Sequence, residues 1–113
     1  MRKNKYNARK VSVDGITFDS VAEARRYGEL KMIEKAGGLM HLVLQPRYDI
    51  IMNGIKCGFY KADFQYWKID LGPGGLNGSV VEDVKGMPTP MYRLKKKLVE
   101  AYYGITITEI KYK

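Results

Sequence analysis

Glu82, Asp83 and Lys85 form a group of closely spaced ionisable residues that could do chemistry. Residues 80–86 read VVEDVKG, a stretch that otherwise has the apolar character of a buried strand. Unpaired charge inside a sheet costs several kcal/mol, so these groups need an explanation. Because strand side chains alternate between faces, Asp83 and Lys85 share one face and Glu82 points to the other. The spacing favours Asp83 over Glu82 as the functional acid, unless a bulge reverses the faces.

A second acid, Asp63, stands in the apolar and aromatic stretch YKADFQYW, where aspartate is normally depleted from strands. If this strand neighbours the one that contains Asp83, the two carboxylates lie opposite or diagonal to each other and repel unless a cation lies between them. Mg²⁺ is typically held by one or two carboxylates and by substrate phosphate oxygens, and it can activate water for phosphodiester cleavage. Lys85 would then orient that water or neutralise the phosphate. The alternative is a structural ion pair between Asp63 and Lys85.

Two further polar residues have weaker patterns. Glu23 shares a helix face with the apolar side chains four and seven residues later, which would point it inward. It is also the acid of a capping box opened by Ser20, so both interpretations stay open. Gln45, before Pro46, either contacts a bound water or phosphate or is a loop residue. The aromatic residues of the same region are interpreted as core rather than as base-stacking platforms: Phe59, Tyr60, Phe64, Tyr66 and Trp67.

The charge of the chain points to a polyanionic partner. Twenty Lys and Arg residues against twelve acids give a net charge of +8 over 113 residues. The basic residues that we single out form two clusters, Lys3, Lys5, Arg9 and Lys10 near the beginning and Arg93, Lys95, Lys96 and Lys97 near the end. Nucleic acid is the commonest partner of such clusters, whereas the alternative is a solvated surface.

Length and composition predict a single domain over residues 1–113, with residues 1–9 as a basic arm. No apolar run approaches the roughly 20 residues that span a membrane, and the N-terminal residues lack the apolar core of a signal peptide. The single cysteine, Cys57, excludes an internal disulfide and favours a reducing compartment. We therefore expect a cytoplasmic protein with no membrane contact.

The secondary-structure pattern predicts an α+β domain with one main sheet packed by helices. Asp14-Gly15 and Asn53-Gly54 predict two hairpins. Between and after them we expect a helix from residue 20 to about 36, strands at 47–52, 55 to about 69 and 79–85, a helix at 91–103 and a strand at 105–110. Residues 71–78 form a glycine-rich connection.

The order of these features resembles the PD-(D/E)XK nuclease superfamily. The stretches VDGITFDSVAEARRY, LQPRYDI, YKADFQYW and VVEDVKGMPTPMYRLKKKL are similar to small phage-encoded endonucleases or Holliday-junction resolvases, over about residues 5–112. The resemblance implies a restriction-endonuclease-like α-β-β-β-α-β core, with a central mixed sheet flanked by helices and an added N-terminal hairpin. Asp63 takes the place of the first aspartate of the motif, Asp83 that of the second acid, and Lys85 that of the lysine. Glu23 matches an acid on the first helix, while Ala62 stands where the motif has proline.

The resemblance implies a metal-dependent DNA endonuclease of phage recombination or replication, working in the host cytoplasm. Mg²⁺, with Mn²⁺ as a substitute, would be bound by Asp63 and Asp83 with help from Glu23, and Gln45 and Glu82 are accessory candidates. The helix 91–103 and the N-terminal arm would contact phosphates of DNA, branched DNA included.

Because one site cuts one strand at a time, paired incisions predict a homodimer, with the hairpin around Asp14-Gly15 as a segment that could pair between subunits. The first alternative function is a non-catalytic nucleic-acid-binding module, and the second is a structural protein that binds another protein.

Overall fold

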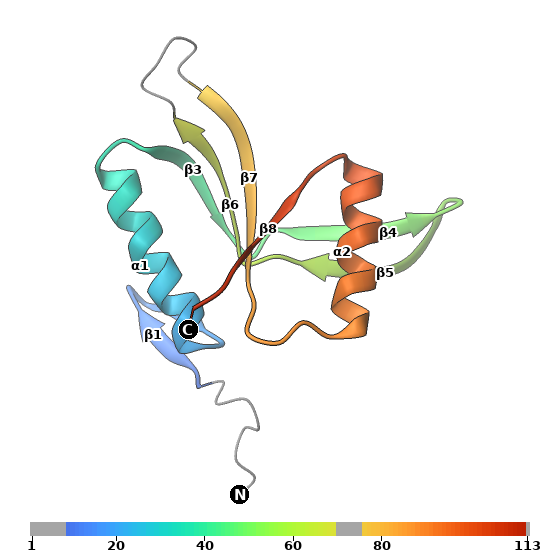
Figure 1. Cartoon of the computed structure of the whole chain (residues 1–113), viewed down its shortest axis with the longest axis horizontal. Coiled ribbons are helices and arrows are strands. Elements are labelled where there is room, and N and C mark those ends of the chain that lie inside the picture. The colour runs from blue at the N-terminus through green and yellow to red at the C-terminus, as the bar shows by residue number, and fades with distance from the viewer. Residues whose placement is uncertain (1–8, 70–75, 113) are drawn as a thin grey trace, which may run out of the picture.

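A computed structural model describes residues 9–69 and 76–112 of the chain (Figure 1). The elements are β1 (Val11–Val13), β2 (Ile16–Phe18), α1 (Val21–Lys35), β3 (Leu39–Leu44), β4 (Arg47–Met52), β5 (Ile55–Lys61), β6 (Phe64–Ile69), β7 (Leu76–Val84), α2 (Pro90–Tyr103) and β8 (Ile107–Ile110). Four strands form a mixed sheet in the order β3-β6-β7-β8, in which β7 and β8 are parallel and the other neighbours antiparallel. The strand pairs β1–β2 and β4–β5 are separate antiparallel hairpins. The α+β class expected from the sequence is therefore present.

Local sequence signals explain where the helices begin and end. The Ser20 hydroxyl accepts a hydrogen bond from the Glu23 amide and caps α1. Thr89 caps α2 in the same way, and Pro90 occupies the first turn, where its missing N–H leaves no bond unmade. Gly104 ends α2 in the left-handed conformation, with φ 67°. The observed helices agree with the predicted ones to within one or two residues.

The central sheet separates two hydrophobic cores, one on each face. On one face Tyr27 and Leu30 of α1 pack against Phe64 and Tyr66 of β6. Phe18 of β2 belongs to the same core. On the other face α2 packs against the sheet and the β4–β5 hairpin, through the buried residues Ile50, Tyr60, Ala62, Val81, Tyr92, Val99 and Ile107. Figure 1 shows the two helices on opposite sides of the sheet, with α2 beside β4 and β5. Consecutive residues of β7 therefore face different cores.

The structure corrects the expected strand 55–69. The chain leaves the β4–β5 hairpin at Lys61 and enters the central sheet at Phe64, so that two strands replace the single one. Residues 39–44, expected only as an apolar segment, form β3 at the edge of the same sheet. Between the helices the described residues thus contain five strands rather than three. Both predicted hairpin turns are present, since Asp14-Gly15 and Asn53-Gly54 all have positive φ.

The N-terminal hairpin packs against the core of its own chain. Its apolar residues Val11, Val13 and Ile16 pack against the core under α1, and the Tyr27 hydroxyl donates a hydrogen bond to Asp14 at its turn. Within one chain its apolar side is therefore covered, and pairing of this hairpin between subunits stays a prediction. In residues 9–69 and 76–112, neither helix is long and apolar enough to cross a membrane.

The interpretation of the strand aromatics as core residues is correct for three of the five. Tyr60, Phe64 and Tyr66 are buried, whereas Phe59 and Trp67 are 41% and 40% exposed. The glycine-rich connection lies partly outside the described residues, and its residues 76–78 belong to β7.

Candidate active site

Asp63 lies at the junction between the hairpin and the central sheet. Its backbone is held on both sides, because its N–H donates to the Glu82 carbonyl (3.0 Å) and its carbonyl accepts from the Gln45 N–H (2.9 Å). Its carboxylate accepts a hydrogen bond of 2.7 Å from the Val84 N–H at the end of β7. Asp63 is therefore fixed where β6 begins and β7 ends. The strand register pairs Phe64 with Glu82, which brings the preceding Asp63 beside Asp83, as the sequence predicts.

Asp83 is a buried acid with two partners on its own face of β7. The Tyr60 hydroxyl donates a hydrogen bond to one carboxylate oxygen, and the Lys85 ammonium lies 3.1 Å from the other. Lys85 is held in turn, since its N–H donates to the Ile110 carbonyl (3.0 Å) and its ammonium lies 4.3 Å from the centre of the Tyr92 ring. The predicted Asp83–Lys85 pair on one strand face is therefore present. The alternative pairing of Lys85 with Asp63 is not among the ion pairs of the described residues.

Electrostatic coupling places Glu23 in the same neighbourhood. The pKa of Asp63 is raised to about 8, first by burial and then by the negative charges of Glu23 and Asp83, against the hydrogen bond from Val84 N–H. The pKa of Glu23 is also raised, first by burial and then by Asp19, with Asp83 contributing as well. The Glu23 N–H thus donates to the Ser20 cap of α1, while its carboxylate lies within electrostatic range of Asp83 and Asp63.

Glu82 is removed from this group of acids by its own partners. It is 1% exposed and points to the α1 face, where Arg26 donates two hydrogen bonds of 2.7 Å to its carboxylate. The Tyr66 hydroxyl donates a third. Its charge is thus paired on the opposite side of the sheet, and the accessory role considered for Glu82 stays a prediction. Of the two adjacent acids, Asp83 is the one on the Lys85 face, as the alternation of strand side chains predicts.

The other candidates occupy the margins of the site. The Gln45 side chain is exposed at a left-handed residue (φ 52°), and its backbone N–H is what contacts Asp63. On α2, the Lys96 ammonium is 3.4 Å from the Glu109 carboxylate, whereas Arg93 and Lys97 are exposed. The remaining basic candidates are placed as follows: Lys95 lies on α2, Arg9 and Lys10 are exposed ahead of β1, and Lys3 and Lys5 fall outside the described residues.

Sequence reasoning missed the tyrosines that hold the site. Tyr60 and Tyr92 are buried, and burial is the first cause that raises the pKa of each hydroxyl, so both remain donors. Tyr60 donates to Asp83, and Tyr92 donates to Glu109 (2.8 Å) while its ring contacts the Lys85 ammonium. Tyr60 precedes Asp63 by three residues, but the bend between β5 and β6 decides where its hydroxyl lies.

The site brings together acidic side chains that repel one another when ionised. In residues 9–69 and 76–112, no three acidic, histidine or cysteine side chains are drawn together into a ready-made metal cage. Mg²⁺ commonly takes only one or two carboxylates and completes its shell with water and phosphate oxygens. Burial raises the pKa of Asp63 first and the charges of Glu23 and Asp83 raise it further, and a bound cation would offset these charges.

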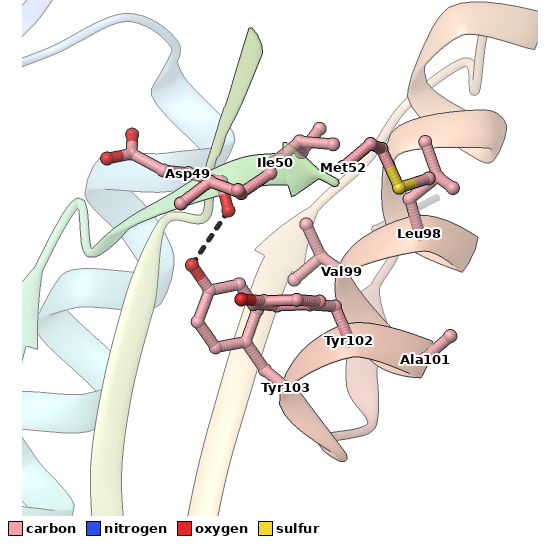
Figure 2. A pocket seen from close by; sticks show the side chains of 9 residues that line it. Asp49, Ile50, Met52, Leu98, Val99, Ala101, Tyr102 and Tyr103 are labelled. Carbon is pink, nitrogen blue, oxygen red and sulfur yellow. Dashed lines mark hydrogen bonds between the residues drawn. The ribbon is translucent and has the colours of Figure 1, made fainter. Parts of the chain in front are cut away.

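An apolar pocket of about 220 Å³ lies elsewhere, between β4 and the C-terminal half of α2 (Figure 2). Its walls include Met52, Leu98 and Tyr102, and the Tyr103 hydroxyl closes one side with a 2.7 Å hydrogen bond to the Asp49 carbonyl. The Asp49 carboxylate points away from the pocket in Figure 2. With no acid or base aimed into it, this pocket is separate from the acidic site.

Fold and site together define an α+β protein with an acidic site on one face of a mixed sheet. The chain belongs to the family described as "Protein of unknown function (DUF1064)", whose model matches residues 3–112. No curated protein and no solved structure matches the chain.

Proposed function

We propose that the protein is a metal-dependent DNA endonuclease of the PD-(D/E)XK type, acting on branched DNA such as a Holliday junction in phage recombination or replication. The observation that carries the proposal is the convergence of Asp63, Asp83 and Lys85 where β6 begins and β7 ends. Two neighbouring carboxylates and a lysine fit a site for phosphodiester hydrolysis.

The order of the elements supports a restriction-endonuclease-like core. The helices and the strands of the central sheet follow along the chain as α1, β3, β6, β7, α2 and β8. This is the α-β-β-β-α-β order that the resemblance implies, with the β4–β5 hairpin inserted between its first two strands and the β1–β2 hairpin ahead of it. Because β4 and β5 are inserted between β3 and β6, the strands of the central sheet are not consecutive along the chain.

The acidic site fits a hard divalent cation, Mg²⁺ or Mn²⁺. Asp63 and Asp83 would bind it, with Glu23 contributing directly or through water, because these are the carboxylates whose charges act on one another. When bound, such an ion activates water and offsets the charge that develops on the phosphate.

The side chains of the chain itself would orient the reactants. The Lys85 ammonium, held between Asp83 and the Tyr92 ring, supplies a fixed positive charge beside the attacking water. Tyr60 fixes the orientation of the Asp83 carboxylate. In the hydrolysis, the water oxygen bonds to phosphorus, the bond from phosphorus to the leaving sugar oxygen breaks, and that oxygen gains a proton, so that one water is added across the cleaved bond.

DNA contact and assembly belong to the same proposal. The basic residues of α2 and of the arm at residues 1–9 would bind phosphates without reading sequence. A homodimer would supply two sites for paired incisions, since the described residues contain one group of Asp63, Asp83 and Lys85. The location would be the cytoplasm, that of the host cell for a phage-encoded protein.

One experiment tests the activity. Supercoiled plasmid and a synthetic four-way junction are incubated with the protein in Mg²⁺, Mn²⁺ or EDTA, and the products are separated on gels. We expect nicked or linear plasmid, or cut junction arms, with either metal and intact DNA in EDTA. Intact substrates under all three conditions would exclude the proposed function.

The second candidate is a non-catalytic nucleic-acid-binding module. It is favoured by one observation: Tyr60 and Lys85 already satisfy both oxygens of buried Asp83 without a metal. This candidate predicts DNA binding that is indifferent to Mg²⁺, and no cleavage in the experiment above.

A further inference from the structure

The β4–β5 hairpin is anchored at the candidate active site. At its base the Ala62 N–H donates to the Pro46 carbonyl (3.0 Å), and the Gln45 N–H donates to the Asp63 carbonyl (2.9 Å). Lys61 ends β5 and precedes Asp63 by two residues. Whatever binds along this hairpin therefore lies next to the acids.

Cations from two elements lie near one exposed aromatic ring on this hairpin, and a third cation pairs with one of them across the strands. The Arg47 guanidinium of β4 lies 4.0 Å from the centre of the Phe59 ring of β5, and the Lys95 ammonium of α2 lies 5.6 Å from it. Lys61 is exposed and pairs across the hairpin with Arg47. We call these four residues, Arg47, Phe59, Lys61 and Lys95, the hairpin surface.

Strand alternation explains why the hairpin surface faces outward. Tyr48, Ile50 and Tyr60 point into the core under α2, so the intervening residues Arg47 and Phe59 point away from it. A ring that is 41% exposed adds nothing to that core. The Phe59 ring instead contacts the Arg47 guanidinium and lies near the Lys95 ammonium, and both cations remain accessible to solvent.

The charge of the hairpin is strongly positive but contains one acid. Asp49 lies opposite Phe59 and forms ion pairs with Arg47 (3.2 Å) and Lys56 (3.6 Å). Its side chain is 42% exposed, so it also contributes a negative potential to the surface that a polyanion would meet. Removing its charge is therefore a test with the opposite sign to that of removing the cations.

We propose that the hairpin surface binds the phosphate backbone of DNA and holds the duplex beside Asp63 and Asp83. The proposal rests on the proposed function, because it takes DNA as the substrate of the neighbouring site. It adds a contact that lies on the inserted hairpin rather than on α2 or the N-terminal arm alone. Guanidinium and ammonium groups recognise phosphate in complementary ways, by paired hydrogen bonds and as a point charge.

The test measures DNA affinity separately from cleavage. Full-length protein with Asp83→Asn serves as the non-cleaving parent, and its dissociation constant for a fluorescent duplex and a four-way junction is measured by anisotropy over a range of NaCl concentrations. Adding Arg47→Ala with Lys61→Ala should weaken binding about tenfold or more near 0.1 M salt, and should reduce the slope of log K against log salt by close to 0.9 per lost phosphate contact. Adding Asp49→Asn to the parent should tighten binding.

The matched control removes the same charge from a distant surface. Lys31→Ala with Lys35→Ala lies on the C-terminal half of α1, which Figure 1 shows on the side of the sheet opposite the hairpin. It should leave both affinity and slope near those of the parent. Thermal melting of each variant checks that the exposed substitutions leave the fold intact.

The outcomes separate this proposal from the proposed function. Loss of binding in the hairpin variant alone supports the hairpin surface, even if wild-type protein cuts no DNA with any metal, in which case the endonuclease proposal fails by itself. Equal affinity and slope in hairpin and control variants would overturn the hairpin surface while leaving cleavage untouched. A parent that binds no DNA would overturn both.

Discussion

Glu82 and Asp83 are neighbours on β7, yet their surroundings differ in kind. Glu82 faces a guanidinium that donates two hydrogen bonds and a tyrosine that donates a third, so its charge is matched inside the protein. Asp83 has one lysine, but it lies among two other acids, Asp63 and Glu23. The charge of Glu82 is therefore matched within the fold, whereas negative charges that lie near one another at the other site would be offset by an external cation.

The largest effect, on the cleavage rate, should come from removing the charge of Asp83. Asp83→Asn should reduce metal-dependent cleavage by about a thousandfold, since loss of a metal ligand removes several kcal/mol of transition-state stabilisation. Glu82→Gln should leave the turnover number within a few fold when measured below its melting temperature, because its side chain lies on the other face. Single-turnover rates of both variants decide this, and equal loss in the two would contradict the assignment.

Removing the partner of Glu82 should lower the stability of the fold rather than the activity. Arg26→Met leaves Glu82 buried without its partner and should lower the free energy of unfolding by about 3–5 kcal/mol. Arg25→Met, one residue earlier and with an exposed side chain, is the matched control and should change it by less than about 1 kcal/mol. Urea denaturation of the two variants compares them directly. Similar midpoints would mean that the Arg26–Glu82 pair does not stabilise the fold.

A smaller effect is expected from changing Tyr60, which orients an acid of the site but is not itself a candidate metal ligand. Tyr60→Phe removes the donor that orients Asp83 and should raise the Mg²⁺ concentration for half-maximal cleavage by about 10–100-fold. Tyr48→Phe also loses a hydroxyl bond, in this case to Gln65, and should leave that concentration unchanged. A metal titration of the cleavage rate checks this, and a matching rise in both variants would point to general loosening of the hairpin.

The smallest effect should be a gain in stability. Because the pKa of Asp63 is raised to about 8 in the folded protein, folding favours its protonated form, and stability should fall as pH rises from about 4 to about 8. Asp63→Asn keeps the acceptor for the Val84 N–H and removes the charge, so at pH 8 without metal it should stabilise by about 1 kcal/mol or more, near 4–8 °C in melting temperature. The gain should vanish at pH 4. Millimolar Mg²⁺ should stabilise the wild type at pH 8 and not this variant.

The parts of this comparison that depend on local rules could be predicted from the sequence. The alternation of side chains along β7 separated Glu82 from Asp83, and the two hairpin turns follow from Asp-Gly and Asn-Gly pairs. The helices follow from local start and stop signals, among them Ser20 before α1 and Gly104 after α2. These signals act within a few residues, so a single sequence is enough to read them.

The parts that depend on distant partners could not be predicted. Residues 55–69 show an unbroken strand pattern, and the bend at Ala62-Asp63 exists because the two halves pair with different strands. Arg26 and Glu82 are 56 residues apart, so their pairing follows from packing α1 on the sheet. Phe59 was expected in the core because hydrophobicity alone cannot tell the two sides of a hairpin apart.

The parallel pairing of β7 with β8 has a consequence for folding. Glu23, Asp63 and Asp83 come from three separate parts of the chain, and the Lys85 backbone is held by the Ile110 carbonyl of β8. Contacts between residues so far apart in sequence form slowly and late, after loop closure has been overcome. The acidic site is therefore complete only in a chain whose β8 has been synthesised and docked. A nascent or partly unfolded chain has the residues of the site but not the site itself.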